Sequence, residues 1–208
     1  MKENNWFDPF YIQSHLSEEE SNIQKNVRNF CNNELKPTVV ERNRKNEFDK
    51  ELYPKFGSLG VLGQTVKTHG GSGTSNLAYG LVAYEFEKID SSYRSSISVQ
   101  SSLVIHPINE FGSQEQKDKY LPQLIKGEKI GCFGLTESEA GSDPASMKTS
   151  FKKTKDGYIL NGSKNWITNA PIADIFIIWA IEENKDHKSI KGFIIEKNTE
   201  GLNTSTIE

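Results

Sequence analysis

The sequence contains few cysteines, and their positions exclude two common kinds of site. The 208 residues include two cysteines, Cys31 and Cys132, which lie far apart in the chain. Two isolated cysteines form neither a metal-binding spacing nor a disulfide framework, and this usage is typical of a reducing compartment. The four histidines also lack the spacing of metal ligands, so the sequence predicts no metal site.

The chain also lacks an excess of basic residues and a long apolar run. Its 25 lysines and arginines are outnumbered by 28 acidic residues, which gives a formal net charge of −3. Nucleic-acid binding requires a clustered basic surface, so we expect no nucleic-acid partner. The longest apolar run, residues 175–181, is much shorter than the ~18 residues of a membrane span, so we expect no span.

The first 130 residues show helical patterns. Two capping boxes, which begin at Ser17 and Ser113, predict the starts of two helices. We expect His106-Pro107 to end one of the helices, because proline cannot donate a backbone hydrogen bond. Apolar residues at helical spacing predict helices at about 17–35, 51–59, 75–88, 92–105 and 113–126.

After about residue 131 the pattern becomes that of β-structure. Asn161-Gly162 is a strong signal for a hairpin turn between two short strands. Strands at a spacing of 8–12 residues, without helices between them, predict an antiparallel barrel or sandwich. The predicted strands are one that begins at Gly131 and others at 158–160, 164–168, 175–181 and 190–195.

These patterns divide the chain into a helical domain, residues 1–130, and a β domain, residues 131–208. Only four or five strands are predicted, and a sheet of that size with open edges is marginal by itself. Either the helices cover the sheet, or the 208 residues are part of a longer polypeptide. We favour the second interpretation, in which the β domain is incomplete.

Three segments contain candidate functional residues. In segment 131–144 a strand breaks into a turn rich in hydroxyls, where Gly141 lets the backbone approach a ligand closely. Alternation places Trp166 and Thr168 on the same face of a predicted strand. There the indole could stack beside a planar ring and the hydroxyl could hydrogen-bond it. The guanidinium of Arg94 suits a carboxylate or phosphate. Each segment also has an ordinary alternative: a common turn, a core tryptophan and a surface arginine.

Two motifs resemble the acyl-CoA dehydrogenase family. Residues 134–146, Gly-Leu-Thr-Glu-x-x-Ala-Gly-Ser-Asp-x-x-Ser, are similar to the flavin-loop signature of that family. Residues 161–169, Asn-Gly-x-Lys-x-Trp-Ile-Thr-Asn, are similar to its second flavin-contact strand. Both follow a helical segment in the family's order and spacing, and the resemblance runs from about Trp6 to the last residue.

The resemblance implies FAD as the cofactor. The flavin carries the redox chemistry, while the protein orients it and tunes its ring. A homotetramer and an electron-transfer flavoprotein, as the electron acceptor, are the implied partners. The positions that match the family's cofactor contacts are Phe133, Leu135, Thr136, Ser142, Trp166, Ile167 and Thr168.

Within the family, the segment around Arg94 is most similar to glutaryl-CoA dehydrogenase. In that subfamily an arginine at this position holds the distal carboxylate of the glutaryl chain, and Glu87 and Ser98 match residues of the same polar network. Ser95 and Ser142 match positions that lie against the thioester. A carboxylate in a desolvated pocket needs a cationic partner, which gives Arg94 a physical role. The implied substrate is glutaryl-CoA.

The implied reaction is an α,β-dehydrogenation with loss of the distal carboxylate. A carboxylate base removes the α-proton, the β-hydride passes to the flavin, and carbon dioxide leaves to give crotonyl-CoA. In the family, the catalytic glutamate and a helical bundle lie in a C-terminal domain that is missing from these 208 residues. No acidic residue of this chain is therefore assigned as the base, and this includes Glu87 and Glu137.

Two other functions stay open. The chain could belong to a dehydrogenase of another short-chain acyl-CoA, for which Arg94 would be incidental, or to a non-catalytic binding protein on the same scaffold. Residues 1–10 show no secretory or organellar leader, if Met1 is the true start. With the many lysines and asparagines, this favours a bacterial cytoplasm, or the mitochondrial matrix if the protein is eukaryotic.

Overall fold

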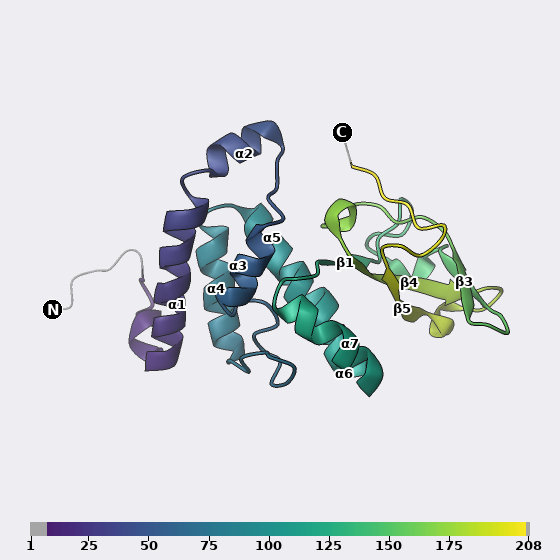
Figure 1. Cartoon of the computed structure of the whole chain (residues 1–208), viewed down its shortest axis with the longest axis horizontal. Helices are drawn as coiled ribbons and strands as arrows, with labels where there is room; N and C mark the ends of the chain where they lie inside the picture. The colour runs from purple at the N-terminus through teal and green to yellow at the C-terminus, as the bar shows by residue number, and fades with distance from the viewer. Residues whose placement is uncertain (1–7, 207–208) are drawn as a thin grey trace.

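The computed structural model describes residues 8–206 as a group of helices followed by a five-stranded sheet. In Figure 1 the helices lie on one side of the molecule and the sheet on the other, in chain order. This arrangement confirms the expected class, an all-α segment followed by β-structure. Within the described residues no helical bundle follows the sheet.

The predicted capping boxes begin two of the helices. The Ser17 hydroxyl accepts a hydrogen bond from the Glu20 amide at 3.2 Å, and the Glu20 carboxylate accepts one from the Ser17 amide at 3.0 Å. Ser113 and Gln116 do the same for α7. The α-helices are α1 (Glu18–Phe30), α2 (Val39–Lys45), α3 (Leu52–Ser58), α4 (Asn76–Glu87), α5 (Ser91–Ser98), α6 (His106–Phe111) and α7 (Gln114–Ile125), with π-helical segments at Cys31–Leu35 and Val99–Ile105.

The sequence patterns predicted neither α6 nor α2. For α2 the reason is local. None of its residues is buried, so it has no apolar stripe to give a periodic signal. Among residues 8–206, no helix has both the length and the apolar character that crossing a membrane requires.

The prediction that His106-Pro107 ends a helix is wrong, because the chain continues as a helix to Phe111. Residues 99–105 form a π-helical segment, and the His106 amide bonds the Ser101 carbonyl, five residues earlier. After this change of register, Pro107 stands in the first turn of α6. Because residues 99–105 are already helical, Pro107 lies within a continuous helical stretch, at the point where the π-helical segment changes to α6.

The sheet is mixed, whereas the sequence predicted antiparallel pairing throughout. β1 and β2 pair in parallel with successive parts of β4, while β5 pairs with β4, and β3 with β2, in the antiparallel sense. Long connections separate β4 from β1 and β2, and such crossovers allow parallel pairing. The strands are β1 (Gly131–Gly134), β2 (Ser150–Lys153), β3 (Tyr158–Asn161), β4 (Ile175–Glu182) and β5 (Lys191–Glu196).

The hairpin predicted at Asn161-Gly162 is also wrong. The hairpin joins β2 to β3, and its turn contains Asp156-Gly157, with Lys153 paired to Tyr158. Gly162 has φ 154°, and a Cβ there would lie 2.4 Å from the Thr149 hydroxyl. The glycine is therefore needed because the backbone at residue 162 passes close to Thr149, and not because it forms a turn.

The two faces of the sheet have different surroundings. Ile175, Ile177 and the half-buried Trp179 belong to the main core, which they share with the helices. Phe176 and the half-buried Ile178 belong to a small separate cluster on the opposite face. The helices therefore cover one face of the sheet, which was one of the two interpretations of the small number of predicted strands. The other face is open.

Candidate functional site

The structure brings the two predicted cofactor segments side by side. The Asn165 amide donates to the Thr136 carbonyl at 2.9 Å, and the Lys164 ammonium donates to the Leu135 carbonyl at 3.0 Å. At the far end of the second segment, the Asn169 side chain donates to the Gly131 carbonyl at 3.2 Å. Residues 131–137 and 164–169 are thus joined along their length.

A buried ion pair lies where these segments meet. Lys164 Nζ is 2.7 Å from Glu137 Oε1, and the two side chains are 8% and 9% exposed. The backbone amides of Lys148 and Thr149 donate to the same carboxylate at 2.7 Å and 3.0 Å. Burial by itself would raise the pKa of Glu137, but the hydrogen bonds from Lys164, Thr149 and Lys148 lower it from 4.5 to about 2.

The prediction that Trp166 and Thr168 alternate along a strand is wrong, because residues 162–169 form no strand. Trp166 has φ 60° and Asn169 has φ 71°, and these left-handed residues break the extended backbone. The result still presents an aromatic ring to a ligand, since Trp166 is 72% exposed. Thr168 and, on the other segment, Ser142 are exposed as well.

The remaining predicted cofactor residues are half-buried. Leu135 and Thr136 carry the carbonyls that bind the second segment. The Phe133 ring packs edge-on against Trp179, with centroids 5.9 Å apart, on the face of the sheet that meets the helices. Ile167 packs in the small cluster on the opposite face.

Four of the five predicted substrate residues lie in the helical half. Arg94 Nε donates to Glu87 Oε2 at 2.7 Å, and the two side chains are 38% and 48% exposed. Ser95 and Ser98 are half-buried on α5, the helix that carries Arg94. The structure therefore joins Arg94 to Glu87 directly, while Ser142 belongs to the loop after β1, on a different element.

Gln100 fixes the helix that carries Arg94 to the sheet. This residue is fully buried in the π-helical segment that continues α5. Its amide nitrogen donates to the Leu124 and Lys129 carbonyls, each at 2.9 Å, and its amide oxygen accepts from the Gly131 amide at 2.8 Å. The start of β1 is thereby held against the candidate substrate helix.

Sequence reasoning missed the roles of Lys164, Glu137 and Gln100. For Lys164 a signal was present, because it is the one charged residue between Asp156 and Asp174. A single charge in a long uncharged segment can be a buried, paired group. Gln100 gave no such signal, since its three backbone partners come from distant parts of the chain.

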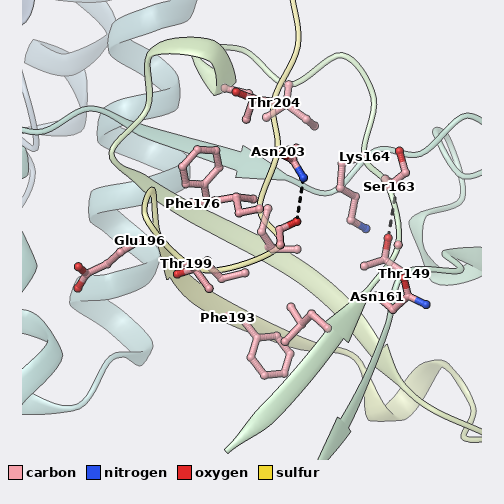
Figure 2. A pocket seen from close by; sticks show the side chains of 18 of the residues that line it. Thr149, Asn161, Ser163, Lys164, Phe176, Phe193, Glu196, Thr199, Asn203 and Thr204 are labelled. Carbon is pink, nitrogen blue, oxygen red and sulfur yellow. Dashed lines mark hydrogen bonds between the residues drawn. The ribbon is translucent and has the colours of Figure 1, made fainter.

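An open groove lies on the uncovered face of the sheet, with a volume of about 1510 Å³. This exceeds the roughly 300–1,000 Å³ of ordinary ligand pockets, because the sheet is open there. Figure 2 shows Asn161, Ser163 and Lys164 on one side of the groove and Glu196 on the other. Of the predicted cofactor residues, Trp166 and Ile167 line the groove, whereas the other five do not.

Comparisons with known proteins identify the family. Residues 17–128 match the model of the acyl-CoA dehydrogenase N-terminal domain, and residues 132–208 match that of the acyl-CoA dehydrogenase middle domain. The chain belongs to the acyl-CoA dehydrogenase family. This family is FAD-dependent, and the resemblance inferred from the two sequence motifs is confirmed.

Individual dehydrogenases show how far the likeness extends. A short-chain acyl-CoA dehydrogenase of Clostridium acetobutylicum is 39% identical over 93% of this chain and 52% of its own length. Mitochondrial isovaleryl-CoA dehydrogenase of Pongo abelii is 40% identical over 91% of this chain and 46% of its own. The crystal structure of a glutaryl-CoA dehydrogenase from Mycobacterium smegmatis with FADH2 gives a TM-score of 0.91 at 40% identity, over 96% of this chain and 50% of that one. The chain thus spans about half the length of these relatives.

The two predicted cofactor segments carry exposed groups of the kinds that bind a planar ring. An exposed indole and the hydroxyls of Ser142 and Thr168 provide a stacking surface and hydrogen-bond donors. A Cβ at Gly141 would meet no atom within 4 Å, so the loop leaves open space for a ligand. On the helix-covered face of the sheet, the buried indole N–H of Trp179 has no hydrogen-bond partner among the described residues.

Proposed function

We propose that this chain forms the helical domain, residues 1–130, and the β domain, residues 131–208, of an FAD-dependent glutaryl-CoA dehydrogenase. The observation that carries the substrate assignment is the ion pair between Arg94 on the candidate substrate helix α5 and Glu87 at the end of α4. Similarity alone does not select the substrate, because short-chain and isovaleryl-CoA dehydrogenases match the chain as well as the glutaryl enzyme does.

Arg94 binds the distal carboxylate of the substrate in this proposal. The bond to Glu87 uses Nε, and a guanidinium carries four further N–H donors in a planar fork that matches a carboxylate. Glu87 fixes the orientation of the fork, and Ser98, one turn further along α5, extends the polar surface. Ser95 and Ser142 lie against the thioester.

The β domain holds and orients FAD, which accepts the β-hydride when it is bound. Trp166 provides the exposed ring beside the flavin, and the hydroxyls of Ser142 and Thr168 donate to its polar edge. Phe133, Leu135, Thr136 and Ile167 are half-buried residues of the same two segments and complete the proposed set of cofactor contacts.

The base that removes the α-proton comes from the part of the enzyme beyond these two domains. Within this chain, Glu137 is a poor base because its pKa is about 2 and its carboxylate is bound to Lys164. Glu87 is already engaged by Arg94. After dehydrogenation, the distal carboxylate leaves as carbon dioxide, and the carbanion that remains takes up a proton at the γ-carbon to give crotonyl-CoA.

The proposal extends to partners and location. An electron-transfer flavoprotein is the acceptor of the electrons, and the complete enzyme is a homotetramer. The cytoplasm of a bacterium is the proposed location, or the mitochondrial matrix in a eukaryote. Relatives of both bacterial and mitochondrial origin support either setting.

The test of the substrate assignment is Arg94→Gln in the complete enzyme. We expect turnover of glutaryl-CoA to fall by about two to three orders of magnitude, because the variant leaves the distal carboxylate unpaired in a desolvated pocket. Turnover of butyryl-CoA should hold, since this substrate has no distal charge. The measurement is kcat/KM for both substrates.

Arg42→Gln is the matched control, because Arg42 also pairs with a carboxylate, Asp49 at 3.0 Å, outside the candidate site. It should change neither substrate's kcat/KM. If Arg94→Gln lowers kcat/KM equally for both substrates, the substrate is another short-chain acyl-CoA and not glutaryl-CoA. A complete enzyme that binds FAD but oxidises no acyl-CoA would favour the non-catalytic function.

A further inference from the structure

We propose that the Lys164–Glu137 ion pair is a positioning device that fixes the two cofactor segments to each other and thereby orients Trp166 and the Ser142 loop. The inference rests on the proposed function, because it treats these segments as contacts of FAD. It assigns a role to two charged residues that are not among the predicted cofactor contacts.

The contacts of the pair reach three separate stretches of chain. Lys164 bonds the Leu135 carbonyl and the Glu137 carboxylate, at 3.0 Å and 2.7 Å. Glu137 also accepts from the amides of Lys148 and Thr149, which closes the loop that contains Ser142. The pair therefore connects both ends of the Ser142 loop, at Glu137 and at residues 148–149, to the segment before Trp166.

The conformation of Trp166 requires such support. A bulky side chain in the left-handed region stores strain, which persists only where the surrounding structure imposes it. Lys164 is two residues earlier, and the Asn165 amide is bound to Thr136. These bonds fix the backbone that enters Trp166, so the exposure of its ring follows from them.

A second lysine–glutamate ion pair on the same loop is exposed to solvent instead of buried. Lys148 and Glu139 form an ion pair with side chains 76% and 71% exposed, compared with 8% and 9% for Lys164 and Glu137. An exposed pair of this kind contributes little. It is therefore a matched control for the removal of a lysine–glutamate pair from this part of the chain.

The experiment uses the complete enzyme with both members of the buried pair replaced, Lys164→Met with Glu137→Gln. Removing both members avoids the stability loss caused by one unpaired buried charge. Three quantities are measured: the melting temperature, the Kd for FAD, and hydrogen exchange of the Asn165 amide in the cofactor-free protein. The control carries Lys148→Met with Glu139→Gln.

We expect the buried-pair variant to melt near the wild-type temperature and to bind FAD at least about tenfold more weakly. Its Asn165 amide should exchange faster, because the hydrogen bond from this amide to the Thr136 carbonyl breaks when the two segments separate. The control variant should match the wild type in all three. Unchanged FAD affinity would overturn the proposal. Faster exchange spread equally over α1 and α4 would also overturn it, since the pair would then support the whole fold.

The two hypotheses fail in different ways. A wild-type complete enzyme that binds no FAD would refute the proposed function. The exchange measurement needs no cofactor, so it still decides whether the pair fixes the two segments.

Discussion

Two glutamates are buried within residues 8–206, and each is matched by a cation. Glu85, 2% exposed, lies 2.8 Å from Arg28 and also accepts a hydrogen bond from Gln24. Glu137 is bound by Lys164 and two backbone amides. A buried carboxylate is costly unless it is paired and hydrogen-bonded, so both sites depend on their partners being in place.

The charge of Glu137 gives a prediction for acid stability. Its folded pKa, about 2, lies below the ordinary value of 4.5, so its contribution is fully present above pH 4.5 and is lost as the pH falls towards 2. The difference in unfolding free energy between the wild type and Glu137→Gln should therefore be constant near neutral pH and should shrink between pH 4.5 and 2. Chemical denaturation at a series of pH values measures it. A difference that stays constant down to pH 2 would show that the carboxylate is not held in its charged form.

The helix from α5 to α6 shows how one side chain can join two structural elements. Its π-helical turn places Gln100 in the core, where a single amide satisfies a carbonyl of α7, a carbonyl after α7 and the first amide of β1. π-helical turns are frequent at functional sites. Here the turn serves the junction between the candidate substrate helix and the first cofactor strand.

Replacing Gln100 by Leu should be strongly destabilising. The apolar side chain has a similar size, but it leaves buried backbone groups without partners, which costs at least about 2 kcal/mol of unfolding free energy. Urea denaturation measures the loss. Gln114→Leu makes the same chemical change on an exposed part of α7 and should stay within about 0.5 kcal/mol of the wild type. Similar losses in the two variants would mean that the bonds of Gln100 are not important for stability.

At the scale of the whole molecule, the sheet is covered by helices on one face and exposed on the other (Figure 1). The open face carries the groove beside Trp166, with apolar side chains such as Phe176 and Phe193 in its lining. The chain spans about half the length of its relatives, so the cofactor site proposed here is built from only part of the residues available to them.

We therefore expect the isolated 208-residue chain neither to retain FAD nor to oxidise glutaryl-CoA. This chain provides one side of the proposed flavin site, and none of its residues is assigned as the base. The apolar groove should also make the isolated chain poorly soluble. Absorbance of the purified protein and dye reduction with glutaryl-CoA test this. A flavin band that copurifies with the chain, together with turnover, would contradict the expectation.

Local chemistry in the sequence was sufficient for some features. The capping boxes at Ser17 and Ser113 begin helices because their bonds involve neighbours in the chain. The change from helices to strands after residue 130 and the two flavin-like motifs were also readable, and the family comparison confirms the resemblance. The candidate residues Arg94 and Trp166 stay predictions for ligand binding, although the structure shows their surroundings.

Tertiary structure decided what depends on distant partners. Asn161-Gly162 and Asp156-Gly157 are equally good turn signals, and only the pairing of β2 with β3 selects the second. The parallel pairing of β4 with β1 and β2, the π-helical turn before Pro107 and the burial of Lys164 likewise depend on contacts far along the chain. The physical reason is that backbone conformation at these positions is set by packing and by hydrogen bonds to remote groups, whose positions a local pattern does not contain.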